Sequence, residues 1–203
     1  MLRLLATIPH KVTVAFSGGV DSLVLAHFLK NGKRDVTLAH FNHGCEYSDQ
    51  IEPECIQRAS ELDCNIIIGN ITNTEVPKGQ SKEEHWRNER YKFLRALGGT
   101  VVMGHHLNDA IESWMFSCIH GNPDLIPVTN GNIVRPLLTT PKTEIESYAY
   151  RNKLVPVHDP FNDDLSLRRN YIRFNIVPHV YHVNPGIEKV IRKKYNKHLT
   201  PME

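Results

Sequence analysis

The residues best suited to chemistry form the hexapeptide Ser17-Gly18-Gly19-Val20-Asp21-Ser22, which directly follows an apolar run at residues 12–16. Two adjacent glycines let backbone amides approach phosphate oxygens, because no β-carbon stands in the way. A carboxylate beside phosphates requires a metal or another cation, so Asp21 indicates that one is present. No lysine follows the glycines, which distinguishes the loop from the common nucleotide-binding P-loop. The hexapeptide therefore predicts a phosphate-binding loop that works together with a cation.

A second group of candidate residues lies within residues 104–113. His105 precedes Asp109 by four positions and Asp109 precedes Glu112 by three, so in a helix these side chains share one face. A carboxylate near a helix N-terminus stays ionised, which suits binding an ammonium group and taking its proton. The same carboxylates could hold magnesium. The residues leave both roles open, and the identity of the metal ligands is unknown at this stage.

Histidines and one arginine complete the set of candidates. His40 and His43 are either ordinary loop histidines or ligands of the nucleotide. A zinc site built from these two with His105 and His106 is disfavoured, since no cysteine accompanies either pair and carboxylates suffice to hold a metal. Arg90 is the cation most suited to contact phosphate or substrate, the alternative being a surface salt bridge.

The elements that must position these residues follow from hydrophobic periodicity. Apolar runs predict strands at residues 12–16, 36–41, 65–68, 100–103 and 133–135. Helical periods predict helices at 22–30, 49–62, 82–97, 107–119 and 141–152, with caps at Ser81 and Thr140. Strands that alternate with helices imply right-handed crossovers and a parallel sheet covered on both faces. We expect an α/β fold: a doubly wound, mostly parallel, Rossmann-like sheet over residues 1–135, with a small helical extension over 136–203.

Composition sets the broad class. The chain has 203 residues, 40% hydrophobic and 23% charged, as in ordinary globular proteins. No apolar run is long enough to cross a bilayer, and the first apolar residues are too few for a signal peptide, so a cytoplasmic enzyme is expected. The four cysteines form no Cys-x-x-Cys pair, which predicts free thiols and neither a zinc ribbon nor an iron–sulfur site.

The charge is unevenly distributed. The formal net charge is +2, yet residues 165–203 carry eight Lys or Arg against two Asp or Glu. A basic tail of this kind often binds nucleic acid. The alternative is a solvated helical face without a partner.

The loop resembles that of the PP-loop (N-type) ATP pyrophosphatases, a HUP-like family that cleaves ATP between the α- and β-phosphates. Further stretches resemble the tRNA(Ile)-lysidine synthetases within it, in order and spacing, from about residue 11 to residue 179. These are 40–44, 89–91, 104–113, 135–138, 159–163 and 169–178. Asn108 stands where that family has an aspartate. The family's C-terminal domains, which grip the tRNA acceptor stem, are expected to be missing.

The resemblance implies an ATP-dependent ligase that adenylates the wobble cytidine of an isoleucine tRNA with a CAU anticodon and then replaces AMP with free L-lysine. It implies ATP and Mg²⁺ as cofactors, and three groups of site residues. The catalytic residues would be Asp21, Asp109, Glu112 and Arg90. ATP would be bound by Ser17, Gly18, Gly19, Val20, Asp21, Ser22, His40, His43 and His106. The tRNA would contact Arg169, Asn170, Arg173, Lys193 and Lys194. The alternatives are another nucleobase-modifying relative, such as a tRNA thiolase, or a catalytically silent RNA-binding relative.

Overall fold

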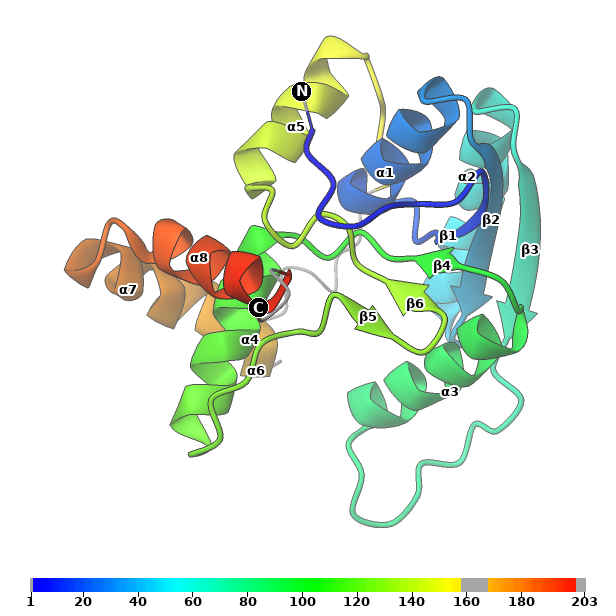
Figure 1. The fold of residues 1–203 in the computed structure, drawn as a ribbon. Helices are drawn as coiled ribbons and strands as arrows, with labels where there is room; N and C mark the ends of the chain where they lie inside the picture. The colour runs from blue at the N-terminus through cyan, green and yellow to red at the C-terminus, as the bar shows by residue number, and fades with distance from the viewer. Residues whose placement is uncertain (1, 158–167, 200–203) are drawn as a thin grey trace.

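The computed structural model describes residues 2–157 and 168–199, apart from the side chains of residue 169 and residues 197–199 (Figure 1). The stretch 159–163, noted above for its resemblance, lies outside these residues. The described strands form one sheet in the order β3-β2-β1-β4-β6-β5. Their bounds are β1 Lys11–Ala15, β2 Asp35–Asn42, β3 Asn65–Asn70, β4 Val101–Val102, β5 Thr129–Asn130 and β6 Ile133–Val134. All pairings are parallel except that of the edge strand β5 with β6.

Helices follow most strands, as the alternating pattern predicts. They are α1 Val20–Asn31, α2 Glu46–Glu61, α3 Lys82–Ala96, α4 Leu107–Ile119 and α5 Lys142–Arg151. The C-terminal helices are α6 Arg168–Tyr171, the π-helical segment η2 Ile172–Ile176, α7 Val177–Val183 and α8 Ile187–Leu199. The α/β class and the mostly parallel sheet are confirmed. Among the described residues, no helix is long and apolar enough to cross a membrane.

The strand order creates the position where a ligand can bind. The chain passes from β1 to β2 on one side, and returns after β3 to place β4 on the other side of β1. In an open parallel sheet, such a reversal opens a crevice at the carboxyl ends of the strands. The segment that leaves β1 here carries the phosphate loop, and the segment that leaves β4 carries His105, His106 and Asp109. The topology therefore brings the two chemistry-bearing segments to one edge of the sheet.

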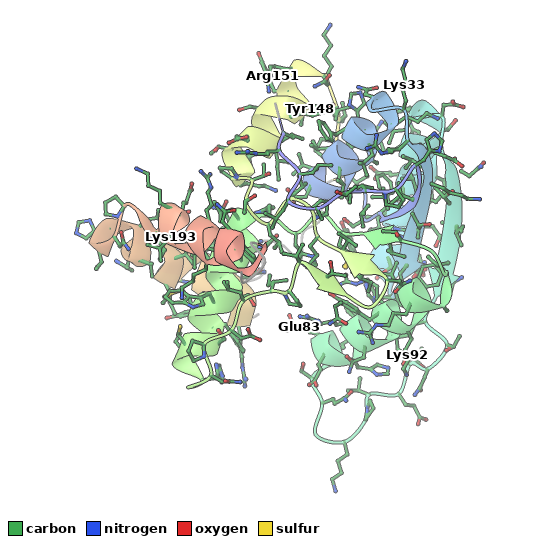
Figure 2. The ribbon with its side chains drawn as sticks, viewed as in Figure 1. Lys33, Glu83, Lys92, Tyr148, Arg151 and Lys193 are labelled. Carbon is green, nitrogen blue, oxygen red and sulfur yellow. The ribbon has the colours of Figure 1, made fainter. Side chains whose placement is uncertain are left out.

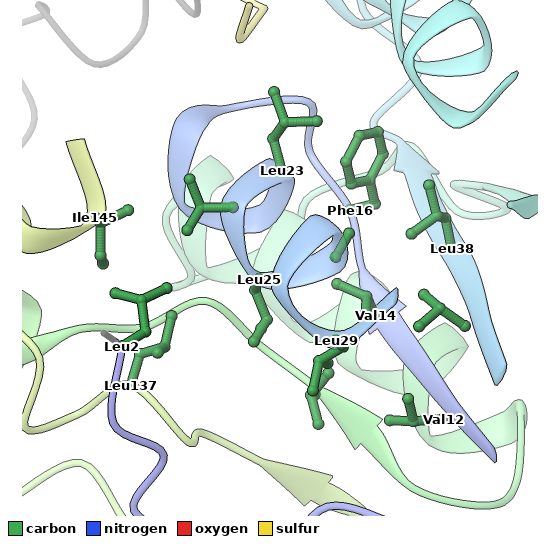
Figure 3. Close-up of a cluster of buried hydrophobic side chains, with 14 of the residues drawn as sticks. Leu2, Val12, Val14, Phe16, Leu23, Leu25, Leu29, Leu38, Leu137 and Ile145 are labelled. Carbon is green, nitrogen blue, oxygen red and sulfur yellow. The ribbon is translucent and has the colours of Figure 1, made fainter. Parts of the chain in front are cut away.

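Side chains alternate between two cores on the two faces of the sheet. Val12 and Val14 are buried on the α1 side of the sheet, in a cluster that also holds Leu25 of α1 and Ile145 of α5 (Figure 3). On the opposite face, Tyr91 and Leu94 of α3 pack with Ala39, Val101 and Met103. Because alternate side chains of β1 face opposite sides of the sheet, this strand packs against a layer of helices on each side, as in other doubly wound sheets.

Helix α5 packs with the α/β body, although it follows the expected boundary at residue 135. Leu137, Ile145 and Ala149 are buried in the same cluster as β1 and α1. A different cluster holds the C-terminal helices, in which Ile187 and Ile191 pack against Ala110 and Ile111 of α4. In Figure 1, α6, α7 and α8 accordingly gather around α4, away from the strands. The extension proper is therefore the part that follows α5.

Two local expectations differ from the structure. The N-cap of α5 is Pro141, not Thr140, and the helix begins at Lys142. Thr140 instead donates a hydrogen bond from its side chain to the carbonyl of Arg3, at 3.2 Å. The antiparallel strand β5 was not predicted, because two exposed residues, Thr129 and Asn130, give no hydrophobic pattern. The Ser81 cap is confirmed, since its Oγ accepts a hydrogen bond from the Glu84 amide at 3.2 Å.

Candidate active site

The phosphate loop is built by a left-handed glycine and an uncapped helix. Gly18 has φ +76°, which turns the chain away from β1. Gly19 is the N-cap of α1, and no side chain caps that end. The Ser22 hydroxyl donates to the Gly19 carbonyl at 3.0 Å and accepts from the Ser17 amide at 3.3 Å. These bonds hold the loop in shape, while the positive end of the helix dipole favours an anion there.

Close packing explains why glycine is required at two positions around the loop. A β-carbon on Gly18 would lie 2.8 Å from Val157 and 2.9 Å from the sulfur of Cys55. A β-carbon on Gly104, at the end of β4, would lie 3.0 Å from the backbone of Asp21. The amide of Val157 also donates to the Gly18 carbonyl at 3.0 Å. The loop is therefore pressed between the segment after α5 and the end of β4.

A cavity of about 270 Å³ lies at this edge of the sheet. Several predicted residues line it, from the loop, β2, α3 and the start of α4: Ser17, Asp21, Ser22, His40, His43, Arg90, His105 and Asp109. Sequence reasoning missed further lining residues, among them Cys45, Tyr47, Trp86 and Met103. Trp86 precedes Arg90 by four positions on α3, so the helical spacing was a signal that could have found it. Five other predicted residues do not line the cavity: Gly18, Gly19, Val20, His106 and Glu112.

His40 and His43 present polar atoms to this cavity. Both side chains line it, and His40 Nε2 and His43 Nδ1 are buried without a hydrogen-bond partner within the described part of the chain. His40 is anchored by Nδ1, which lies 3.0 Å from the Phe16 carbonyl. His43 stacks on Trp86 at 5.0 Å. Burial, together with Arg90 and His40, lowers the pKa of His43 to about 4, so this ring is neutral near pH 7. A nucleotide could supply the missing hydrogen bonds.

The carboxylate of Asp21 is paired with a lysine from α5. Lys142 Nζ lies 2.6 Å from Asp21 Oδ1. His106 Nε2 lies 3.7 Å from the same oxygen and 3.5 Å from Asp109 Oδ2. The backbone amide of His106 also donates to Asp109 Oδ2 at 2.9 Å. The structure thus brings Asp21, His106 and Asp109 together, and Lys142 is an additional member that the sequence did not indicate.

The other two carboxylates are held by Arg173. Its Nε lies 2.6 Å from Glu112 Oε1, and its Nη2 lies 3.3 Å from Asp109 Oδ1. Burial alone would raise the pKa of Asp109, but His106, His105 and Arg173 outweigh it and the pKa is lowered. Burial raises the pKa of Glu112, and Arg173 opposes only part of that effect. Asp109 therefore stays ionised more readily than Glu112. Glu112, which makes the shorter contact, is the better anchor for Arg173.

The residues expected to contact tRNA separate into two sets. Arg173 pairs with Glu112 in the carboxylate cluster and remains 35% exposed, whereas Asn170 is only 7% exposed. Arg173 lies on the π-helical segment η2, which follows directly after α6. The side chain of Arg169 lies outside the described structure. Lys193 and Lys194 are exposed on α8, where Figure 2 shows Lys193 at the outer surface.

The site fits a nucleotide triphosphate better than a preformed metal centre. The loop, the helix N-terminus and the two histidines offer donors and acceptors to phosphates and a base. In the part of the chain that the structure describes, no three His, Cys, Asp or Glu side chains are grouped to hold a metal ion. Mg²⁺ is usually bound by one or two carboxylates together with substrate phosphates. Asp21 and Asp109, which both line the cavity, are the residues that fit this role.

A larger cavity of about 670 Å³ shares His105 with the first. It lies between α3, α4 and the segment that leads into β5. Arginines and a lysine are prominent in its lining: Arg87, Lys92, Arg95 and Arg135. Arg135 is buried and donates to the Tyr91 hydroxyl at 3.0 Å. The shared histidine makes this second, positively lined cavity a neighbour of the phosphate loop's own cavity.

Comparison with known proteins agrees with this geometry. Residues 3–180 match the PP-loop domain family. The chain is 29% identical to tRNA(Ile)-lysidine synthase of Francisella tularensis, over 93% of this chain and 50% of that protein. It is 32% identical to tRNA(Ile)-lysidine synthase of Persephonella marina, over 88% of this chain and 43% of that protein. The chain thus spans about half the length, or less, of these relatives.

One solved structure shares the fold. The U34-tRNA thiolase NcsA from Methanococcus maripaludis, determined with its [4Fe-4S] cluster, superposes with a TM-score of 0.75. The match covers 97% of this chain and 75% of that one, at 19% sequence identity. At this identity the likeness concerns the fold alone.

Proposed function

The chain belongs to the PP-loop domain family, and on that premise we propose that it is an ATP-dependent ligase that modifies tRNA, forming lysidine at the wobble cytidine. One observation carries the proposal: Asp21 of the phosphate loop and Asp109 of α4 line the same cavity at the carboxyl ends of β1 and β4. The similarity to tRNA(Ile)-lysidine synthases supports the choice of RNA and of lysine as substrates.

The proposed reaction has two steps. The carbonyl oxygen on carbon 2 of the cytidine attacks the α-phosphorus of ATP, and pyrophosphate leaves. The amine of free lysine then attacks carbon 2, loses a proton, and AMP leaves. The substrate would be an isoleucine tRNA with a CAU anticodon. Magnesium, when bound with ATP, would neutralise the developing negative charge on the pyrophosphate.

The residues of the chain would divide this work. Ser17, Ser22 and the N-terminus of α1 would hold the phosphates through hydrogen bonds. Asp21 would hold magnesium together with the phosphates. Asp109 would receive the lysine ammonium and orient it, because its pKa is lowered and it is therefore ionised near neutral pH. Arg90, which lines the same cavity, would pair with the phosphate or with the ribose-phosphate of the substrate.

The second cavity offers a route for the RNA. A base that is adenylated must reach the α-phosphate, and sequence-specific RNA recognition commonly uses an unstacked base from a loop. The cavity that shares His105 carries arginines and a lysine able to contact the flanking phosphates. We expect the anticodon loop to enter there, with the wobble base turned toward His105.

A tRNA thiolase is the second candidate, and Cys45 is the observation that favours it. Cys45 lines the phosphate-loop cavity and lies 3.1 Å from the Ser48 hydroxyl through its sulfur. Cys55 is buried behind the loop, against Gly18. A single cysteine at the cavity provides less than a sulfur-transfer site usually requires, so the lysine reaction is preferred.

The test is pyrophosphate release from ATP, with tRNA and lysine each omitted in turn and with sulfide replacing lysine in a further reaction. An anticodon stem-loop is included beside full tRNA, so that recognition of the anticodon is measured separately from recognition of the acceptor stem. The proposal requires release that depends on RNA, and a nucleoside product that contains lysine. A product that contains sulfur would select the thiolase. RNA binding without any pyrophosphate release would indicate a catalytically silent relative.

A further inference from the structure

The phosphate loop has no lysine of its own, yet a lysine reaches it from α5. Lys142 Nζ lies 2.6 Å from Asp21 Oδ1, across 121 positions of sequence. We propose that Lys142 is a phosphate-binding residue of the ATP site, held on Asp21 while the site is empty and transferred to the β- and γ-phosphates when ATP binds. This inference rests on the ATP-binding part of the proposed function and not on the RNA or lysine steps.

The backbone of Lys142 is fixed close to the loop. Its amide donates to Asn108 Oδ1 at 3.0 Å, and the Leu107 amide donates to the Thr140 carbonyl at 2.9 Å. The first turn of α4 and the start of α5 are thereby joined just beside Asp21. Asn108 does this without adding a negative charge, whereas an aspartate there would offer Lys142 a second carboxylate.

The side chain of Lys142 is able to move while its backbone stays in place. It is 29% exposed, so water or a ligand can reach the ammonium group. A lysine carries its charge on a flexible four-carbon stem with three donors, which suits a change of partner. Asp21 would keep a second neighbour after Lys142 has moved, since His106 Nε2 lies 3.7 Å from Asp21 Oδ1.

Electrostatics favours the transfer. An ionised Asp21 without a cation would repel a triphosphate, and Lys142 removes that repulsion before the ligand arrives. Once phosphates occupy the site, the ammonium can pair with several oxygens instead of one carboxylate. Asp21 is then free to hold magnesium, which prefers carboxylate and phosphate oxygens. Asp21 and Lys142 would thus each have an oppositely charged partner both before and after ATP binds.

A purely structural role is the competing explanation, in which Lys142 only fastens α5 to the loop. Binding measurements without RNA separate the two. The ligands are α,β-methylene-ATP, which keeps the triphosphate and resists cleavage, and AMP, which lacks the β- and γ-phosphates. Titration calorimetry of the full chain with magnesium compares the wild type with Lys142→Ala and Lys142→Arg. The matched control is Lys30→Ala, since Lys30 pairs with Asp63 at 3.1 Å, is 35% exposed, and lies at the far end of α1.

We expect Lys142→Ala to weaken the binding of the ATP analogue by about 10- to 100-fold, the loss typical of one charge-assisted hydrogen bond. AMP should bind within about twofold of wild type, and Lys30→Ala should bind both ligands normally. Lys142→Arg should retain most of the affinity for the analogue. Equal losses for AMP and the analogue, or no loss for either, would overturn the assignment.

A double variant guards against an indirect effect through Asp21. In the Asp21→Asn background, Lys142→Ala should still weaken binding of the ATP analogue, because the phosphate contact is lost independently of the ion pair. If Lys142 acts only by holding Asp21, the second substitution will have no further effect, and the proposal is wrong. Failure of the wild type to bind the analogue would overturn both this inference and ATP use. Normal binding without tRNA modification would overturn only the proposed reaction.

Discussion

The guanidinium group of Arg173 makes a two-point contact with the carboxylate of Glu112, with Nε 2.6 Å from Oε1 and Nη2 3.1 Å from Oε2. Glu112 lies on α4 and Arg173 on the π-helical segment η2, 61 positions away. The same guanidinium reaches Asp109, which lines the phosphate-loop cavity. The C-terminal helices are thereby fastened directly to the helix that carries the candidate catalytic carboxylates.

Removing this contact should destabilise the protein. Arg173→Ala leaves the buried Glu112 without its cation, and we expect a loss of about 2–3 kcal/mol in the free energy of unfolding. The value lies below the range for fully buried pairs because Arg173 is 35% exposed. Urea unfolding measures it, with Arg192→Ala as the control. Arg192 is about as exposed as Arg173, but its partner Glu188 is 30% exposed against 10% for Glu112, so this substitution should cost less than about 1 kcal/mol. A double variant, Arg173→Met with Glu112→Gln, should recover most of the loss. Equal costs for the two arginines would contradict this account.

Asp21→Asn tests the phosphate loop with little change in shape. We expect RNA-dependent pyrophosphate release to fall by about 10²- to 10³-fold, the loss typical of one group that stabilises charge in the transition state. Stability should change by less than about 1 kcal/mol, because Asp21 is partly exposed and its pair with Lys142 is near the surface. Asp63→Asn is the control, as it also removes a carboxylate paired with a lysine, but on an exposed loop. Release at the wild-type rate from folded Asp21→Asn protein would remove Asp21 from the catalytic site.

Gly18→Ala separates backbone strain from packing. The left-handed backbone alone costs a non-glycine residue about 1–2 kcal/mol. The added β-carbon would also lie 2.8 Å from Val157 and 2.9 Å from Cys55, so we expect a total loss of about 2–4 kcal/mol and weaker ATP binding. Gly98→Ala is a matched control, since Gly98 has φ +68° and no atom within 4 Å of the new β-carbon. Thermal or urea unfolding compares the two variants. If both lose the same free energy, the contact with Val157 and Cys55 has no energetic role.

Local sequence is sufficient to predict the phosphate loop and the parallel strands, but not the ion pairs between distant segments. The strand before Ser17 and the glycines after it are contiguous, so their periodicity and conformation could be read directly. The pair of Asp21 with Lys142 joins residues 121 positions apart, and nothing local to either residue indicates it. The family resemblance implies a tRNA contact for Arg173, and its ion pair with Glu112, 61 positions away, is likewise not indicated by local sequence. The packing of Ile145 in α5 with the core around α1 is a long-range relationship of the same kind.

Titration of His43 should make stability fall in mild acid. Its pKa is lowered from 6.5 to about 4 by burial, Arg90 and His40, so the unfolded chain binds this proton more tightly than the folded one. The stabilisation is complete above pH 6.5 and is lost as the pH falls toward 4, by up to about 1.4 kcal/mol per pH unit. His43→Phe keeps an aromatic ring beside Trp86 but does not titrate. The free energy of unfolding of both proteins is measured with urea from pH 7 to pH 5. As the pH falls, the wild type should lose stability relative to the variant. A constant difference would show that His43 does not contribute.

The exposed lysines of α8 should govern the salt dependence of RNA binding. Lys193 and Lys194 are exposed, and Lys194 Nζ lies 5.7 Å from the ring of Trp114, which holds it on the side of α4. Each phosphate contact that is lost should reduce the slope of log affinity against log salt by roughly 0.7 to 0.9. Lys193→Ala with Lys194→Ala should thus weaken tRNA binding and flatten the slope by about 1.5, with little effect on turnover at saturating tRNA. Filter binding across a salt series makes the measurement. Lys11→Ala with Lys33→Ala removes two exposed lysines from the opposite end of the molecule, where Figure 2 shows Lys33, and should leave the slope unchanged. If the two double variants lower the slope equally, α8 is a solvated helix and the RNA is held elsewhere.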